Sequence, residues 1–314
     1  MQVRPFKQVD VFTAVAYFGN PLGVVLDGTG LSHAEMQHFT NWTNLSECTF
    51  LLPPTDAQAD YKVRIFCPGR ELPFAGHPTL GTCHAWLEAG GQPKGEFIVQ
   101  ECGAGLIKIK RDAASGRLAF AAPALIKSGL LDEADVAVIA RGLKIDRSDI
   151  VAHAWCDNGP HWRGVMLRSA EHVLSLKPDA SILAGLDIGV VGPRGKVGVV
   201  GERLSAAGPS QGAKAPMWGS AAHEVASVGV GSDPQFEVRA FFPGNNGMTE
   251  DPVTGSLNAA MAQWLIGAGL APSRYVVAQG AAMGRAGRVH VEQDGADIWI
   301  GGASVTCMDG KVNI

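Results

Sequence analysis

The stretch Val63-Arg64-Ile65-Phe66-Cys67-Pro68-Gly69 returns 175 positions later as Val238-Arg239-Ala240-Phe241-Phe242-Pro243-Gly244. Five of the seven positions are identical in the two copies. Each copy is an apolar run that closes with Pro-Gly, which predicts a short strand ended by a turn. The repeat indicates that this chain of 314 residues contains an internal duplication.

A second pair of similar segments, 78–91 and 256–269, follows these two strands. Both segments are apolar on nearly every side, and a helix without a polar face is buried inside its own domain. A glycine-rich turn precedes each segment and a glycine closes it, which are signals of helix boundaries. The residues that the two segments share are Trp86 and Trp264, Leu87 and Leu265, and Gly91 and Gly269.

Further matches extend the duplication along the chain. They join 97–100 to 275–278, 106–110 to 288–292 and, more weakly, 23–26 to 164–167. Each copy predicts the order strand, helix, strands, buried helix and hairpin strands. We therefore expect an α+β fold of two pseudo-symmetric lobes, each a mostly antiparallel rolled sheet around a central buried helix.

The expected lobes are residues 1–120 and 121–314, with the last strand free to pair with the first lobe. Two such lobes leave a cleft between them, and clefts between domains are favoured ligand sites. Residues 203–234 are rich in serine, alanine and glycine and have no counterpart in the first copy. We interpret them as an inserted loop.

Composition and charge narrow the class of protein. The 26 basic and 30 acidic residues give a net charge of −4, which argues against a nucleic acid or an anionic membrane as the partner. No apolar segment is long enough for a signal peptide or a transmembrane helix. The six cysteines form no C-x-x-C pair, so we expect free thiols and a cytoplasmic protein. His77 and His84 lack the spacing of a metal site, and no metal or cofactor is expected.

Two turns lead into the predicted buried helices, at 72–79 and at 250–256. The N-terminus of a buried helix has free N–H groups, and its dipole favours an anion. Two such ends facing each other could hold a carboxylate without Arg or Lys. The alternative is that Thr79, Thr254 and Ser256 only cap their helices.

Three ionisable residues are candidates for chemistry, each with a structural alternative. Glu47, just before an apolar strand, is either a solvated strand end or, if buried, a carboxyl whose raised pKa suits acid/base catalysis. An imidazolium at His77 would lower that pKa again, but His77 could equally be a structural residue at a helix start. Asp251 could simply complement the helix dipole.

At Asn44-Leu45-Ser46-Glu47, Glu71–Pro78 and Glu250–Ser256, the chain resembles the phenazine-biosynthesis F family. Asp10-Val11-Phe12-Thr13 and Gly19-Asn20-Pro21 fit the same family. The resemblance implies the diaminopimelate epimerase fold, with the site between two similar lobes. It also implies cofactor-independent isomerisation or epimerisation, similar to that of trans-2,3-dihydro-3-hydroxyanthranilate isomerase.

The resemblance further implies roles for individual residues. Glu47 would be the proton-shuttling acid/base, with His77 and Asp251 as polar helpers. The residues implied in binding the substrate are Ser46, Gly76, Gly255 and Ser256. Racemases and epimerases of this fold place two facing cysteines in the cleft, whereas Ala75 and Asp251 stand at those places here. A two-thiol racemase is therefore disfavoured.

The chain departs from the family pattern at Ser256-Leu257-Asn258, where Ser-Ala-His is frequent, and in the 203–234 insertion. The expected protein is a homodimeric isomerase that acts on a small carboxylic acid. The alternative is a non-catalytic protein that binds small carboxylates on the same scaffold. Retention of Glu47, His77 and Asp251 favours the enzyme, because a binding protein would need only the helix ends.

Overall fold

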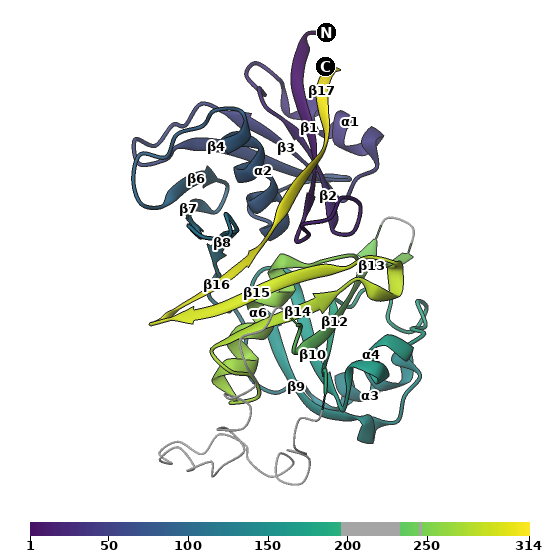
Figure 1. Ribbon diagram of the computed structural model, residues 1–314. Helices are drawn as coiled ribbons and strands as arrows, with labels where there is room; N and C mark the ends of the chain where they lie inside the picture. Colours follow the sequence, from purple (N-terminus) through teal and green to yellow (C-terminus); the bar gives the residue numbers. More distant parts are fainter. Residues whose placement is uncertain (196–232, 245–246) are drawn as a thin grey trace.

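The structure, a computed structural model, describes residues 1–195, 233–244 and 247–314 (Figure 1). The insertion predicted at 203–234 lies almost wholly outside these residues. Strands dominate the described part and five α-helices accompany them. The helices are α1 (His33–Thr43), α2 (Gly76–Glu88), α3 (Glu133–Leu143), α4 (Ala170–Ser175) and α6 (Gly255–Gly267). Two short 3₁₀ turns are η1 (Arg147–Asp149) and η2 (Ala281–Met283).

The first eight strands precede α3, and the others follow it. The first group is β1 (Val3–Val11), β2 (Asn20–Val25), β3 (Glu47–Leu52), β4 (Tyr61–Cys67), β5 (Arg70–Leu72), β6 (Ile98–Cys102), β7 (Gly105–Arg111) and β8 (Leu118–Ala121). The second group is β9 (Ile150–Asp157), β10 (His161–Leu167), β11 (Ile188–Pro193), β12 (Phe236–Gly244), β13 (Gly247–Asp251), β14 (Arg274–Gln279), β15 (Gly287–Asp294), β16 (Asp297–Gly302) and β17 (Ser304–Asn313).

Strands β1–β8 and β9–β16 pair in the same way. In the first run, β2 and β3 and also β4 and β6 are parallel, while the other neighbours are antiparallel. In the second run, β10 and β11 and also β12 and β14 are parallel, with the same antiparallel neighbours. The mixed, sheet-dominated α+β class predicted from the sequence is confirmed.

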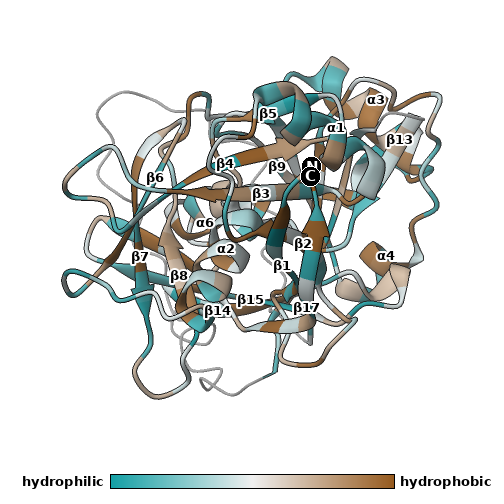
Figure 2. Cartoon of the chain, turned by 90° about the horizontal axis from the view of Figure 1, so that it is seen from above, coloured by the Kyte–Doolittle hydropathy of each residue, from teal (hydrophilic) through white to brown (hydrophobic). Residues whose placement is uncertain are grey.

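Each parallel pair is joined through a helix, because parallel strands need a long crossover connection. Helix α1 joins β2 to β3, and α4 joins β10 to β11. Helices α2 and α6 join β4 to β6 and β12 to β14. Helix α2 packs against β1, β2, β3 and β8, and α6 against β9, β10, β15 and β16. Figure 2 looks down on α2 and α6, which lie in the middle of the surrounding strands.

The apolar character of α2 and α6 places both helices in the core. Leu80 of α2 and Leu257 of α6 are fully buried, and full burial of such a side chain contributes about 1.5–3 kcal/mol. Both helices also carry small residues, such as Gly81 in α2 and Ala259 in α6, which let the strands approach the helix closely. At Gly81 a Cβ atom would lie 2.6 Å from the side chain of Leu22.

Two pairings connect the first group of strands, β1–β8, to the second group, β9–β17. Strand β8 pairs with β16, and the last strand, β17, pairs with β1 from Val3 opposite Asn313 to Val11 opposite Ser304. The two termini consequently lie side by side (Figure 1). Within the described residues, no helix is long and apolar enough to cross a membrane.

One sequence match is shifted by a residue in the strand ladders. Tyr61 pairs with Gln100, and Phe236, its counterpart in the repeat, pairs with Val277. Gln100 therefore corresponds to Val277, although the sequence match had aligned it with Ala278. Neighbouring strand residues point to opposite faces, so only the pairing partner decides between two alignments one residue apart.

Candidate active site

Helices α2 and α6 begin against each other. A Cβ atom on Gly255 would lie 3.0 Å from Cα of Gly76 and 3.2 Å from the backbone nitrogen of His77. A Cβ atom on Gly76 would lie 2.7 Å from the ring of Phe120. Glycine suits both positions, because a Cβ atom on Gly255 would be tight against the backbone of α2 and a Cβ atom on Gly76 would displace the ring of Phe120.

Neither helix start has a side-chain cap. Ala75, the N-cap residue of α2, has no side-chain oxygen, and the hydroxyl of Thr79 donates to the carbonyl of Ala75 at 2.9 Å. Thr254 is the N-cap of α6, but its hydroxyl donates to Oδ2 of Asp251 at 2.6 Å. The capping alternative is therefore wrong for these residues. The uncapped starts leave backbone N–H groups and the positive dipole ends for an anion.

Ser256, the second residue of α6, is held by two side chains. Nε1 of Trp162, on β10, donates to Oγ of Ser256 at 3.2 Å. Nδ2 of Asn158 donates to the carbonyl of Ser256 at 2.9 Å. Because an indole N–H can only donate, the Ser256 hydroxyl accepts there and keeps its own proton for another acceptor.

Glu47 opens β3 and faces His77 on α2. Oε2 of Glu47 lies 3.3 Å from Nε2 of His77, and neither atom has a hydrogen bond within the described residues. The side chains are 17% and 6% exposed, so Glu47 is not the solvated strand end that was the alternative.

Burial changes the charge state of this pair. It raises the pKa of Glu47 to about 8, and the negative charge of Asp251 adds to this. It lowers the pKa of His77 to about 3. At neutral pH, Glu47 is mostly protonated and His77 is neutral. Burial therefore disfavours the imidazolium form of His77, which would have lowered the pKa of Glu47.

Asp251 ends β13 and comes from the second half of the chain. Its Oδ1 accepts a hydrogen bond from Nδ2 of Asn20 at 3.0 Å, and its Oδ2 accepts one from Thr254. Burial raises the pKa of Asp251 to about 6, although both hydrogen bonds favour the charged form. Two nearby carboxyls with separated pKa values can act in different protonation states near neutral pH.

Four of the eleven buried polar side-chain atoms that have no hydrogen-bond partner among the described residues belong to residues named above. They are Oδ1 of Asn20, Oε2 of Glu47, Nε2 of His77 and Oδ1 of Asn158. Most buried polar atoms in proteins are hydrogen-bonded, so such a group of exceptions needs an explanation. A polar ligand that brings its own donors and acceptors would satisfy these atoms.

The sequence missed three of these residues as site residues. Asn20 was noted only within a family motif, and no pattern marked Trp162 or Asn158. Among the predicted residues, Ser46 precedes β3 and is partly exposed, with no hydrogen bond to Glu47 or His77.

None of the six cysteines stands at Ala75 or Asp251, the two places where the family resemblance puts the thiols of a racemase. Ala75 and Asp251 occupy the helix start and the strand end, and all six cysteines are free. Burial raises the pKa of Cys48 to about 11 and that of Cys83 to about 12, which disfavours thiolates. Cys83 is buried, whereas Cys67 is only partly buried. Among the described residues, no His, Cys, Asp and Glu group could hold a metal ion.

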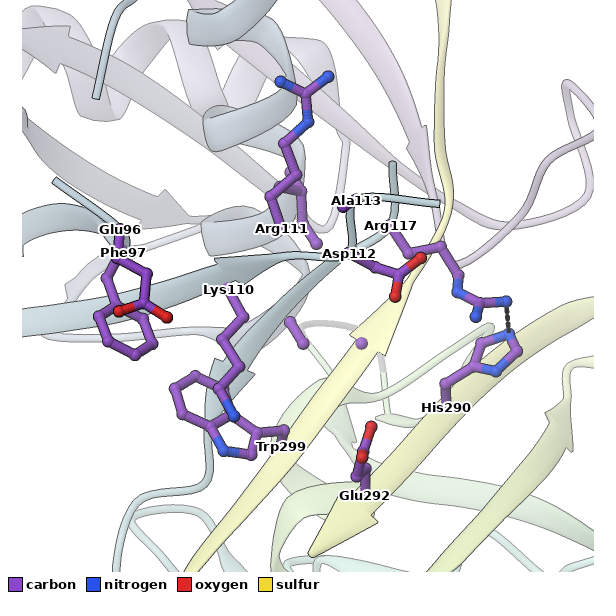
Figure 3. Close-up of a pocket in the computed structure, with 13 residues that line it drawn as sticks. Glu96, Phe97, Lys110, Arg111, Asp112, Ala113, Arg117, His290, Glu292 and Trp299 are labelled. Atoms are coloured by element: carbon purple, nitrogen blue, oxygen red, sulfur yellow. Dashed lines mark hydrogen bonds between the residues drawn. The ribbon is translucent and has the colours of Figure 1, made fainter. Parts of the chain in front are cut away.

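A separate pocket lies between β7–β8 and β15–β16 (Figure 3). In it, Nη1 of Arg117 lies 3.4 Å from Nε2 of His290. Its basic side chains, Lys110, Arg111 and Arg117, are balanced by Glu96, Asp112 and Glu292. It contains none of the predicted site residues, so the candidate site remains the one at the helix starts.

Comparison with known proteins gives relatives along the whole chain. Antisense-enhancing sequence 1 of Schizosaccharomyces pombe is 32% identical over 324 aligned residues, which cover 99% of each chain. An uncharacterized isomerase of Mesorhizobium japonicum is 31% identical, with full coverage of both chains. Trans-2,3-dihydro-3-hydroxyanthranilate isomerase of Pseudomonas fluorescens is 33% identical over 179 residues, 56% of this chain and 62% of that protein.

A solved structure shares the fold. The phenazine biosynthesis protein of the PhzF family from Bacillus anthracis superposes with a TM-score of 0.75 at 21% identity, over 100% of both chains. With relatives that are isomerases, the chain is an enzyme of the isomerase class. It belongs to the phenazine biosynthesis-like protein family (PhzC-PhzF), which it matches over residues 9–310.

Proposed function

We propose that the protein is a cofactor-independent isomerase or epimerase that moves a proton on a small carboxylic acid, with Glu47 as the acid/base. The proposed substrate is similar to trans-2,3-dihydro-3-hydroxyanthranilate, on which the relative from Pseudomonas fluorescens is named to act. The observation that carries the proposal is the group of buried, unpartnered polar atoms of Glu47, His77 and Asn20 beside two uncapped helix starts.

The substrate carboxylate would bind at the starts of α2 and α6. Backbone N–H groups at Gly76 and Gly255 would donate to it, and both helix dipoles favour the negative charge. The Ser256 hydroxyl, whose oxygen already accepts from Trp162, would donate its proton to a substrate oxygen. Ser46 is the remaining proposed binding residue, at the start of β3.

The proton transfer would use both forms of Glu47. Ionised Glu47 would take a proton from one carbon of the substrate, and protonated Glu47 would return it to another carbon or to the opposite face. No net proton is gained or lost in the cycle. A pKa of about 8 keeps both forms accessible near neutral pH. His77 would orient the Glu47 carboxyl, and ionised Asp251 would assist with orientation and proton handling.

We further propose two pseudo-symmetric lobes, residues 1–120 and 121–314, with the site between them. The equivalent strand pairings of β1–β8 and β9–β16 support this division. We expect a homodimer that acts in the cytoplasm, and size-exclusion chromatography with light scattering measures the oligomeric state.

Solvent exchange tests the proposed activity. The protein is incubated in deuterated water with trans-2,3-dihydro-3-hydroxyanthranilate and with other small cyclic and acyclic acids, and carbon-bound deuterium is followed by NMR. We expect enzyme-dependent deuterium at a carbon near the carboxylate. Tight binding of acids without any exchange would instead identify a non-catalytic carboxylate-binding protein.

A further inference from the structure

Asn20, the first residue of β2, connects the two halves of the site. Its side chain is fully buried. Nδ2 lies 3.0 Å from Oδ1 of Asp251, 3.0 Å from the carbonyl oxygen of Val253 and 3.4 Å from Nδ1 of His77. One amide group thus touches the imidazole of the first half and the carboxylate of the second half.

The orientation of the Asn20 amide follows from its partners. The Val253 carbonyl can only accept a hydrogen bond, so the Asn20 atom facing it must be the nitrogen. An ionised Asp251 carboxylate makes the same demand. The amide nitrogen has no acceptor capacity, so Nδ1 of His77 can interact favourably with it only as an acceptor.

We infer that Asn20 is a positioning residue that keeps the neutral His77 ring in the tautomer with its proton on Nε2. In that tautomer, the N–H of His77 lies on the side of Glu47, whose Oε2 is 3.3 Å away. In the other tautomer, an N–H at Nδ1 would face the Asn20 N–H group, and a lone pair would face Glu47. Asn20 therefore decides whether Glu47 meets a donor or an acceptor.

The consequence for catalysis rests on the proposed function. Oε2 of Glu47 and Nε2 of His77 are 3.3 Å apart without hydrogen-bond geometry, so a small rotation of either side chain would let an N–H at Nε2 hold the Glu47 carboxylate while it takes a proton from the substrate. Loss of this control would disturb the orientation of Glu47 while the binding groups at the helix starts stay intact. Removal of a hydrogen bond to a charged group typically costs about 10- to 100-fold, so we expect Asn20→Leu to lower kcat by about that factor, with a smaller effect on KM.

The tautomer is measured directly, without substrate. Protein labelled with ¹⁵N-histidine is examined by long-range ¹H–¹⁵N NMR at neutral pH, and the His77 signals are assigned with His77→Gln. We expect a non-protonated Nδ1 and a protonated Nε2 in the wild type. In Asn20→Leu we expect a mixture of tautomers or the reversed one, and Asn20→Ala is measured as well in case the leucine variant does not fold.

Thr49→Val is the matched control. Thr49 is fully buried in the same half and accepts a hydrogen bond from Thr82, and among the described residues it has no hydrogen bond to His77 or Asn20. Its loss should cost stability but leave the His77 signals unchanged. A proton on Nδ1 in the wild type, or an unchanged Nε2–H signal in a folded Asn20 variant, would overturn the inference.

The two proposals fail separately. If no acid undergoes exchange but the wild type has the Nε2–H tautomer that Asn20→Leu abolishes, the proposed function is wrong and the tautomer control stands. If exchange depends on Glu47 but the tautomer is unaffected by Asn20→Leu, the role of Asn20 is wrong and the proposed function stands.

Discussion

The two copies of the Val-Arg-x-Phe-x-Pro-Gly repeat form the same ion pair at different depths. Arg64 binds Glu71 with two hydrogen bonds, at 2.7 and 2.6 Å, and Arg239 binds Glu250 with two, at 2.9 and 2.7 Å. The side chain of Arg64 is 25% exposed, whereas that of Arg239 is 6% exposed. Arg239 also donates to two carbonyls of the α4 region. The same sequence therefore builds the same geometry, and the neighbouring helix decides how buried it is.

The helix starts show the same principle with different chemistry. The second residue of α2 is His77, and the second residue of α6 is Ser256. The first half contributes Glu47 and His77 to the candidate site, while the second half contributes Asp251 and Ser256. The two runs of strands thus share one pairing pattern and differ in the side chains at their helix starts.

The largest functional difference between the two halves is expected at Glu47. We expect Glu47→Gln to lower turnover by about 10²–10⁴-fold, because general acid–base catalysis contributes about that much. The amide keeps the size of the side chain but cannot exchange a proton with carbon. Steady-state kinetics measure turnover, and calorimetry checks that substrate still binds. Near-native turnover in this variant would show that Glu47, in the first half, is not the acid/base.

The two arginines give the next largest difference. We expect Arg239→Met to lower the free energy of unfolding by about 3–5 kcal/mol, because Glu250 would be left buried and unpaired. Arg64→Met should cost about 0–1 kcal/mol, the value of a more exposed pair. Urea denaturation of both variants measures the two losses. Equal losses would show that burial by α4 does not distinguish the copies.

Asp251→Asn tests whether Asp251, in the second half, contributes less to turnover than Glu47, in the first half. We expect turnover to fall by about 10- to 100-fold, less than in Glu47→Gln, because the amide keeps the hydrogen-bonding shape and loses the charge. The pKa of Glu47 should also move down, since the Asp251 charge helps to raise it. The pH dependence of kcat/KM reports that shift. A loss as severe as in Glu47→Gln would assign the acid/base role to the second half.

Two glycine substitutions in α6, one at its start and one at its end, test the contact between the starts of α2 and α6. Gly255→Ala should lower stability by about 1–3 kcal/mol, because its Cβ atom would collide with the backbone at Gly76. Gly267→Ala, at the exposed end of α6, meets no atom within 4 Å and should raise stability by about 0.5–1 kcal/mol. Thermal unfolding of the two variants gives opposite shifts if the starts are in contact.

The last comparison concerns the pH dependence of stability. Glu47 titrates at about 8 in the folded protein, against an ordinary value of 4.5. The folded state holds a proton that the unfolded chain releases, so the free energy of unfolding falls as the pH rises between these values. Glu47→Gln should remove this loss and gain about 3 kcal/mol relative to the wild type between pH 5 and pH 8, because each pH unit in this range changes the free energy of unfolding by about 1.4 kcal/mol.

Glu71→Gln is the control for that measurement. Its hydrogen bonds to Arg64 lower the pKa of Glu71, so its contribution is present above the ordinary pKa of a glutamate and is lost as the pH falls. Denaturation at several pH values should therefore show that Glu71→Gln leaves the slope between pH 5 and pH 8 as in the wild type and changes the pH dependence of stability only below the ordinary glutamate pKa. A wild-type slope that Glu47→Gln leaves unchanged would mean that Glu47 is not buried in solution.

Local patterns predicted a large part of the fold. The strand copies at 63–69 and 238–244 and the helices after them were predictable because apolar runs, Pro-Gly turns and closing glycines act over a few residues. The one-residue error between 97–100 and 275–278 arose because short apolar strands align almost equally well one position apart. Only pairing with a neighbouring strand removes that ambiguity.

The amino-acid sequence by itself determined the duplication, the buried helices and, through the family motifs, Glu47, His77 and Asp251 as candidates. Only the tertiary structure decided that both helix starts are uncapped and that His77 is uncharged. It also decided that Asn20 joins His77 to Asp251, 231 positions further along the chain. The physical reason is that hydrogen-bond partners and desolvation depend on which distant segments pack together, and no local pattern encodes that packing.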